Sequence, residues 1–532
     1  MWFRLLLILL LMSRVILWKV DHFVAKISGD ENVAKEISKT FGVHYLGEVH
    51  HVLPQIGRLR VLRNKSLSIL SSSEELNRPC SRVTECATWD INFNDPFFPY
   101  QWYLDAGVSY DVSGTWISSD PMPDLRHYIQ NSHGTQCAAI ISAAGNNSYC
   151  GVGVAFKAKV GGVRLLKGEK SHVIDAQEAL ALRVAITKRV DIIVSSWGPP
   201  DNGKSIGEPE ELAKQAIIEG IEKGRNGKGA IFLWAVGNGG LSDNCNLDGY
   251  ASSIYTIAIS SLTKSGYPCV YDEPCSATLA SCYVGGKEPN DRNHLHTDNM
   301  VVPQLDGGCK NSFQGTSAAT PLAAGIVALM LQANGNLTWR DVQHIIVRSA
   351  RKPSNHYGWL QNGAGLSYHI FSGFGAIDAA KAAELSSTWD SVPPQRNVTA
   401  LIPGLPRYLL PTSRSLLKVL VPPREDFKTF ILEHTILIVS LASTTRGKIE
   451  LSLTSPSGTV SHLLTERPLD DAQSGFKDWR FMSTHFWLED PTGVWAVVVN
   501  NLTEDFGEIK DARILFYGFC VEQGNKKSYM SF

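Results

Sequence analysis

Three short apolar runs decide the fold of this chain: Asp191-Ile-Ile-Val-Ser-Ser196, Ala230-Ile-Phe-Leu-Trp-Ala-Val236 and Ile254-Tyr-Thr-Ile-Ala-Ile259. They are rich in β-branched and aromatic residues, a similar run covers residues 160–166, and helical patterns separate them. Parallel strands need a long crossover connection, which is usually a helix. The alternation therefore predicts an α/β domain whose parallel sheet is covered by helices, from about residue 83 to residue 390.

The segments on either side of this region have different patterns. Residues 19–82 combine strand-like runs at 23–27 and 45–51 with a helical stretch at 33–40, which predicts a small α+β domain. After the turn-rich Ser391-Val-Pro-Pro394 the chain is strand-like to residue 522, and a short tail covers residues 523–532. Residues 391–522 are therefore predicted to form an all-β sandwich or barrel.

Composition narrows the class of protein. The chain has 532 residues, of which 50 are Lys or Arg, 51 are Asp or Glu and 44% are apolar. These values exclude a disordered or collagen-like chain. They also argue against a nucleic-acid partner, because such binding needs a basic surface. Any recognition of charge must be local.

The N-terminus is typical of a secretory signal. Arg4 precedes an apolar run over residues 5–12, so residues 1–18 are predicted to be a signal peptide. An uncleaved anchor is the alternative, because Arg14 interrupts the segment and no small-x-small cleavage site follows. Membrane association is expected only in that second case. No later window is long enough to span a bilayer.

Secretion has two chemical consequences. The chain has ten cysteines, and in an oxidising compartment they should partly pair, with a connectivity that spacing alone leaves open. Five Asn-x-Ser/Thr sequences are candidate glycosylation sites, with chance occurrence as the alternative, namely Asn64, Asn146, Asn336, Asn397 and Asn501.

Three residues are candidates for catalysis. Ser317, in Gly315-Thr-Ser-Ala-Ala-Thr-Pro321, precedes a buried helical run, where a nucleophile would lie at the positive end of the helix dipole. Taken alone, an N-cap serine is the better interpretation. His133 also begins an apolar helical run and could be a capping or surface histidine. Asn238 follows an apolar strand and could donate to an oxyanion or only form a turn.

The order His, Asn, Ser in one α/β region resembles the subtilisin-type serine proteases, and specifically the furin/kexin-like proprotein convertases. The resemblance is carried by His133-Gly-Thr-Gln-Cys-Ala and by further motifs, namely Cys150-Gly-Val-Gly-Val-Ala, Ser196-Trp-Gly-Pro, Asn246-Leu-Asp-Gly-Tyr250 and Leu337-Thr-Trp-Arg-Asp. It runs from about residue 20 to residue 520. Asp120-Pro-Met-Pro and Trp339-Arg-Asp-Val-Gln-His-Ile-Ile-Val indicate the proprotein convertase subtype 7 branch.

The resemblance implies a fold and a function. It implies a doubly wound subtilisin-like α/β domain between an inhibitory prodomain and a jelly-roll-like P domain. Ser317 would be the nucleophile, His133 the general base and then acid, and Asn238 the oxyanion donor. The activity would be calcium-dependent cleavage of precursor proteins after basic residues, in the secretory pathway. The expected location is the lumen or membrane of the Golgi or trans-Golgi network, or secretion from the cell.

The same resemblance assigns further residues. Carboxylates that bind basic substrate side chains would be Asp201, Asp248, Glu178 and Asp175. Calcium would be held by Asp201, Asp243 and Glu273, which without the resemblance would be three solvated loop acids. Cys150 would pair with Cys309, Cys245 would pair with Cys275, and Cys137 would stay unpaired beside His133. Gly207 and Lys167 depart from the acids usual in the family, so selectivity beyond the first basic residue is not assigned.

One departure concerns catalysis itself. A Ser-His protease needs a carboxylate to orient the imidazole, and the family takes it from Asp-Asp-Gly at the end of an apolar strand. Here only 28 residues separate Leu104 and His133, without that motif, which predicts a deletion. Asp105, Asp111, Asp120 and Asp124 are the local carboxylates. The alternative function is therefore an inactive isoform that binds basic peptides without cutting them, and an adhesion module built on the β domain is a third class.

Overall fold

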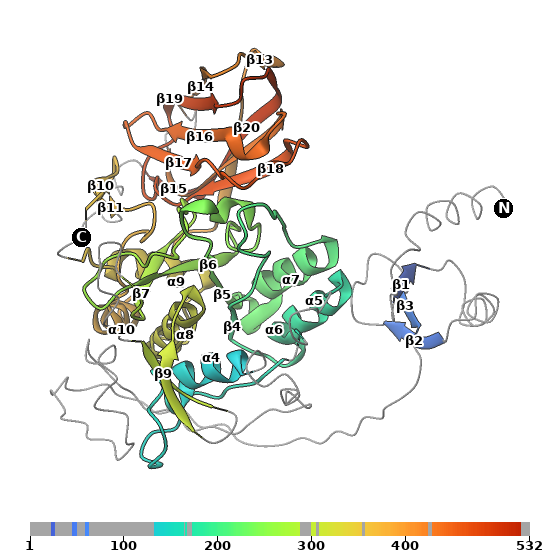
Figure 1. Cartoon of the computed structure of the whole chain (residues 1–532). Coiled ribbons are helices and arrows are strands. Elements are labelled where there is room, and N and C mark those ends of the chain that lie inside the picture. The colour runs from blue at the N-terminus through green and yellow to red at the C-terminus, as the bar shows by residue number, and fades with distance from the viewer. Residues whose placement is uncertain are drawn as a thin grey trace. The chain divides into compact units, whose positions relative to one another are not determined.

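The structure is a computed structural model of the 532-residue chain. It describes residues 23–26, 45–49, 59–62, 132–163, 165–166, 173–287, 299–304, 308–353, 357–423 and 428–522. The chain divides into two compact units, Met1–Ile91 and Asn92–Phe532, which are described separately (Figure 1).

The first unit contains one small antiparallel sheet. Its strands are β1 (Phe23–Lys26), β2 (Tyr45–Val49) and β3 (Leu59–Leu62), in the order β1-β3-β2. The strands predicted at 23–27 and 45–51 are confirmed. The helix predicted at 33–40, the signal segment 1–18 and Asn64 lie outside the described residues.

A parallel four-stranded sheet forms the centre of the second unit. Its strands are β4 (Ile192–Ser195), β5 (Ile231–Ala235), β6 (Thr256–Leu262) and β7 (Ala280–Tyr283), and they are neighbours in chain order. The three runs quoted at the outset are confirmed as strands β4, β5 and β6. The strand expected at 160–166 is wrong for the described residues there. Val163 and Leu166 are about half exposed, so this run does not enter the apolar core.

Helices cover both faces of this sheet, because alternate side chains of each strand point to opposite sides. Ile231 and Leu233 pack into the core that contains helix α8 (Thr316–Ala333), whereas Phe232 and Trp234 pack among helices α5 (Asp175–Leu182), α6 (Val184–Thr187) and α7 (Glu211–Gly227).

The described part of the unit also contains α4 (His133–Ser142), α9 (Trp339–Ser349), α10 (Ala379–Ser387), β8 (Met300–Pro303), β9 (Cys309–Phe313), β10 (Leu360–Gln361) and β11 (Ser367–Tyr368). Within the described ranges, α8 alone has the length and apolar composition of a membrane span, and 72% of it is buried.

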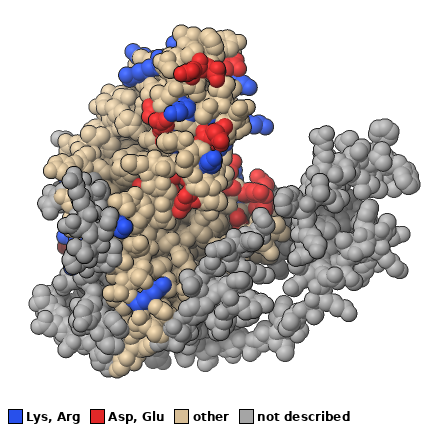
Figure 2. Space-filling model, viewed as in Figure 1, with Lys and Arg blue, Asp and Glu red and all other residues tan. Residues whose placement is uncertain are grey.

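Residues 396–522 form the predicted all-β domain. One antiparallel sheet orders β12 (Arg396–Leu401), β20 (Gly507–Glu522), β15 (Lys428–Ala442) and β18 (Phe476–Ser483), and β13 (Arg407–Leu409) also pairs with β20. The other orders β14 (Ser413–Val421), β19 (Gly493–Asn501), β16 (Ile449–Thr454) and β17 (Val460–Leu464). Inward residues of both sheets, among them Trp495 and Phe516, share one core, so the domain is a sandwich. Figure 2 shows acidic and basic side chains interspersed over the visible face of this domain, at the top of the view.

Both expected disulfides are confirmed. Cys150 is bonded to Cys309, and Cys245 is bonded to Cys275. Among the described residues, the cysteines outside these two disulfides are Cys137, Cys269, Cys282 and Cys520.

The glycosylation candidates differ in exposure. Asn146, Asn336 and Asn397 are exposed. Asn501 is buried, and its Nδ2 donates hydrogen bonds to the carbonyl oxygens of Leu410 and Asp505. The folded domain therefore leaves no room for a glycan on Asn501, so the prediction for that residue is not supported.

Candidate active site

The candidate nucleophile lies in the first turn of the buried helix α8. Gly315 is the N-cap, with φ of +96°, and Thr316 is the first helical residue, so Ser317 is half-buried inside the helix and is not its cap. The carbonyl oxygen of Ser317 accepts hydrogen bonds from Ser196 Oγ at 3.2 Å and Cys137 Sγ at 3.5 Å. The end of strand β4 and helix α4 therefore both hold this turn, and the capping interpretation of Ser317 is wrong.

His133 begins helix α4 and lies next to the same turn. Its ring packs edge-on against Phe313, with 5.4 Å between the ring centroids, and its Nδ1 lies 3.8 Å from Cys137 Sγ. Burial lowers the pKa of His133, and the charge of Lys310 lowers it further. The imidazole is therefore neutral at pH 7 and can accept a proton. Nδ1 lies near Cys137, and among the described residues no hydrogen bond joins His133 to Ser317.

Cys137 links these two residues without supplying a charge. Burial raises its pKa to about 12, so the thiol stays protonated. A neutral thiol is a weak hydrogen-bonding group and cannot stabilise an imidazolium as a carboxylate does. Among the residues that the structure describes, no carboxylate hydrogen-bonds His133. The deletion predicted between Leu104 and His133, its four local carboxylates and Lys167 lie outside the described residues.

Asn238 connects the nucleophile turn to a carboxylate. It follows strand β5 in a turn where Gly237 has φ of +104°, and its Oδ1 accepts hydrogen bonds from Thr316 N at 2.9 Å and Thr316 Oγ1 at 3.1 Å. These two hydrogen bonds fix the orientation of the side-chain amide, so Nδ2 is the atom that can donate to a ligand. The Asn238 main-chain N–H donates to Asp201 Oδ2 at 2.9 Å, and Nδ2 lies 3.4 Å from the same oxygen.

Three carboxylates gather around this turn. Glu273 is buried, and its Oε1 accepts a hydrogen bond from Gly239 N at 2.9 Å. Burial raises its pKa well above the usual range, and the charges of Asp243 and Asp201 add to the shift. The pKa of Asp201 is also raised, by desolvation and then, against the hydrogen bonds from Asn238, by Asp243. Within the described ranges, no group of three or more His, Cys, Asp or Glu side chains forms a ready metal cluster.

Asp248 lies next to Gly198, at the end of strand β4. It accepts hydrogen bonds from the main-chain N–H groups of Tyr250, at 2.7 Å, and Ala251. Burial raises its pKa to about 7 despite these bonds. A Cβ on Gly198 would lie 2.5 Å from Asp248 Oδ2, so only glycine leaves this carboxylate in place. Gly207, where the family often has an acid, forms a main-chain bridge with Asp248.

The two acids expected further along the groove differ in their roles. Glu178 Oε2 accepts a hydrogen bond from the Tyr250 hydroxyl at 2.7 Å, and burial raises its pKa. Asp175 uses both of its oxygens to accept hydrogen bonds from Leu212 N and Ala213 N, at the start of helix α7. Asp175 is therefore engaged inside the protein, a role that the sequence did not indicate.

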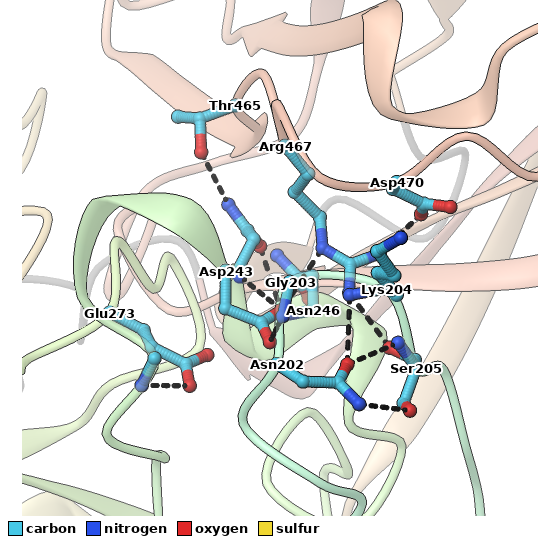
Figure 3. Close-up of polar contacts among 12 residues, drawn as sticks. Asn202, Gly203, Lys204, Ser205, Asp243, Asn246, Glu273, Thr465, Arg467 and Asp470 are labelled. Carbon is cyan, nitrogen blue, oxygen red and sulfur yellow. Dashed lines mark hydrogen bonds and ion pairs between the residues drawn. The ribbon is translucent and has the colours of Figure 1, made fainter.

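Two further residues belong to the site and were not predicted. The Tyr271 hydroxyl accepts a hydrogen bond from Gly315 N at 3.0 Å, and so holds the residue before Thr316. Arg467 of the β domain forms an ion pair with Asp243 at 3.0 Å (Figure 3). No motif marks either residue, because each acts through a contact between segments far apart in the chain.

A serine at the start of a buried helix, a neutral histidine and a strand-end asparagine define the class of a subtilisin-like serine protease. The comparisons agree with this geometry. Residues 94–360 match the subtilase family, and residues 432–516 match the proprotein convertase P-domain. The chain belongs to the proprotein convertases of the subtilase family.

Relatives and solved structures support this placement. Human neuroendocrine convertase 2 is 34% identical over 570 residues, covering 94% of this chain and 88% of the relative. Furin-like protease 1, isoform 1-CRR, of Drosophila melanogaster is 43% identical over 417 residues, covering 78% of this chain but only 36% of that relative. The crystal structure of the Aeromonas sobria serine protease with its chaperone has a TM-score of 0.67 at 19% identity, covering 81% of this chain and 96% of that one, which shows the fold. The subtype 7 branch stays a prediction.

Proposed function

We propose that this chain is a serine endoprotease that cleaves precursor proteins after basic residues. One observation carries the proposal: Asn238 hydrogen-bonds both the nucleophile turn, at Thr316, and the carboxylate of Asp201. A carboxylate beside the oxyanion donor is suited to an arginine or lysine next to the scissile bond, because a charge-assisted pair gains both energy and orientation.

The residues would act as follows. Ser317 Oγ attacks the scissile carbonyl carbon while His133 Nε2 takes the hydroxyl proton, and Asn238 Nδ2 donates to the oxygen that gains negative charge. The C–N bond then breaks as His133 returns the proton to the leaving amine, and water hydrolyses the resulting acyl ester of Ser317, with His133 first taking the water proton and then returning it to Ser317 Oγ. The lowered pKa of His133 favours its neutral form before attack. The imidazolium that His133 becomes also needs a stabilising group. The residues described around Nδ1 do not supply one, so that group must belong to other residues.

We also propose calcium as the ion that holds the site. The charge of Asp243 contributes to the raised pKa of Asp201 and of Glu273, and the charge of Asp201 contributes to that of Glu273, so negative charge is concentrated here although Arg467 pairs with Asp243. Carboxylate oxygens suit a hard divalent cation, and this set would bind calcium. Bound calcium would compensate the negative charges of these three carboxylates around the turn that contains Asn238. Added calcium should then raise the thermal unfolding temperature, and Glu273→Gln should remove most of that rise.

Membership of the proprotein convertases and the apolar N-terminal segment support a cellular setting for this activity. We propose that the chain enters the secretory pathway and acts in the Golgi or trans-Golgi network or after secretion, with residues 19–82 as its intramolecular inhibitor. Precursor proteins with basic cleavage sites are the proposed partners.

Expression in a secretory host tests the activity. The chain and its Ser317→Ala variant should be compared for prodomain release by immunoblotting and for cleavage of an Arg-x-Lys-Arg fluorogenic peptide in calcium. Cleavage that Ser317→Ala abolishes supports the endoprotease. An uncut, inactive precursor that still binds basic peptides would instead support the inactive alternative.

A further inference from the structure

Two arginines of the β domain, Arg446 and Arg467, are buried against the other domain of the same unit. They are 6% and 1% exposed, which is exceptional for arginine side chains. Both pair with the buried Asp470: Arg446 Nε and Nη2 lie 2.8 and 3.0 Å from its two oxygens, and Arg467 Nη1 lies 2.5 Å from Oδ2. Asp470 therefore fixes the two guanidinium groups relative to each other.

Each of the two arginines also donates one hydrogen bond to a loop of the protease domain, residues 201–205. Arg467 Nη2 donates to the carbonyl oxygen of Ser205 at 2.8 Å, and Arg446 Nη2 donates to that of Lys204 at 2.8 Å. Arg467 Nε completes the set with the 3.0 Å ion pair to Asp243 (Figure 3). Among the described residues, Arg467 thus donates hydrogen bonds from Nη1 and Nη2 to two different partners and pairs by charge with a third, without a hydrogen bond from Nε, an arrangement that a lysine ammonium cannot reproduce.

The loop is also tied internally and to Asp243. Asn202 Oδ1 accepts hydrogen bonds from Lys204 N and Ser205 N, at 2.9 and 2.8 Å. Gly203 N donates to Asp243 Oδ2 at 2.8 Å, on the carboxylate that Arg467 holds through its other oxygen. Residues 202–205 and Asp243 therefore form one rigid group whose outer anchor is Arg467.

Asp201 lies directly before this group, and within the described ranges its carboxylate accepts hydrogen bonds from Asn238 alone. We propose that Arg467 is a positioning residue for the recognition of basic substrate side chains: by fixing residues 202–205 and Asp243, it sets the place of the Asp201 carboxylate. The inference rests on the proposed function. It makes selectivity for arginine or lysine depend on a residue of the β domain that does not touch substrate.

The experiment measures binding rather than cleavage, so that it does not require an active enzyme. The full chain carrying Ser317→Ala is titrated into fluorescein-labelled Arg-Val-Lys-Arg peptide, and into the same peptide ending in citrulline, with anisotropy as the signal. Citrulline keeps the shape of arginine and removes its charge. The ratio of the two affinities reports the carboxylate pocket, whereas general loss of structure lowers both.

Arg467→Lys should weaken binding of the arginine peptide about tenfold, equal to about 1.4 kcal/mol, and change citrulline binding less than about twofold. Amide hydrogen exchange of residues 202–205 should become faster in the same variant. Arg340→Lys is the matched control, because Arg340 is a buried arginine that joins the two domains through Glu433, without contact to residues 201–205. It should leave the affinity ratio unchanged.

The possible results distinguish a failure of the proposed function from a failure of the inference about Arg467. A parent chain that binds both peptides equally overturns the proposed function and this inference with it. A parent that discriminates, together with an Arg467→Lys variant that discriminates as well, overturns the inference alone. If Arg467→Lys does not fold, the exposed Asn202→Ala variant replaces it, because it releases the same loop from within. Unchanged discrimination in that variant also overturns the inference.

Discussion

The contact between Glu433 and helix α9 provides the most quantitative prediction. Glu433 is 1% exposed and binds Arg340 Nε and Nη2 at 2.9 and 2.5 Å, His344 Nε2 at 2.8 Å and Gln395 Nε2 at 3.0 Å. Burial alone would raise its pKa, but the hydrogen bond from His344 and the charge of Arg340 hold it well below the usual range. Glu433→Gln leaves the Arg340 charge buried and uncompensated. We expect it to lower the free energy of unfolding by about 3–5 kcal/mol.

Urea unfolding followed by tryptophan fluorescence measures this change, because Trp487 Nε1 donates to His344 Nδ1 at 3.3 Å and so reports the same cluster. Glu450→Gln makes the same substitution at a half-buried site whose partner is Asn500, and should cost less than about 0.5 kcal/mol. Glu433→Leu combined with Arg340→Met should cost less than Glu433→Gln alone, because no charge stays unpaired. A loss below about 1 kcal/mol in Glu433→Gln would refute the argument that this buried charge cluster joins the domains.

Three further predictions concern pH, a disulfide and the pocket. Burial lowers the pKa of His434 to about 4, so the folded protein keeps this histidine neutral, and the free energy of unfolding falls as the pH drops from 6.5 toward 4. The decrease in unfolding free energy between pH 7 and pH 5 should be smaller by about 2 kcal/mol in His434→Gln than in the parent. Equal decreases in the two proteins would contradict this. Removing the Cys245–Cys275 disulfide with alanines should cost about 3–4 kcal/mol in urea unfolding, because the bond spans 30 residues, whereas no change would show that other contacts already restrict that loop. Gly198→Ala should weaken binding of the arginine peptide far more than the citrulline peptide, because the new Cβ would lie 2.5 Å from Asp248 Oδ2; equal weakening would place Asp248 outside the pocket.

Local sequence patterns were enough for three strands of the central sheet, β4, β5 and β6, and for the β domain, whereas strand β7 was not predicted. A continuous or nearly continuous run of apolar residues predicts each of these buried elements, namely strands β4, β5 and β6 and helix α8. The run at 160–166 was mispredicted for the same reason, since apolar composition indicates a strand whether or not a neighbouring strand is available. The pairing of the two disulfides was predicted from the resemblance to the family, because cysteine spacing alone leaves the connectivity open.

The sequence by itself determined the α/β class and the β domain, because these depend on short-range periodicity, whereas the roles proposed for Ser317, His133 and Asn238 rest on motifs that resemble a family. Only the tertiary structure decided which polar groups are available. It engaged Asp175 at the start of helix α7, buried Asn501, and brought Arg467 to Asp243 from another domain. The physical reason is that a carboxylate or amide has a fixed chemistry but a variable set of partners, and those partners come from segments that only the folded chain places together.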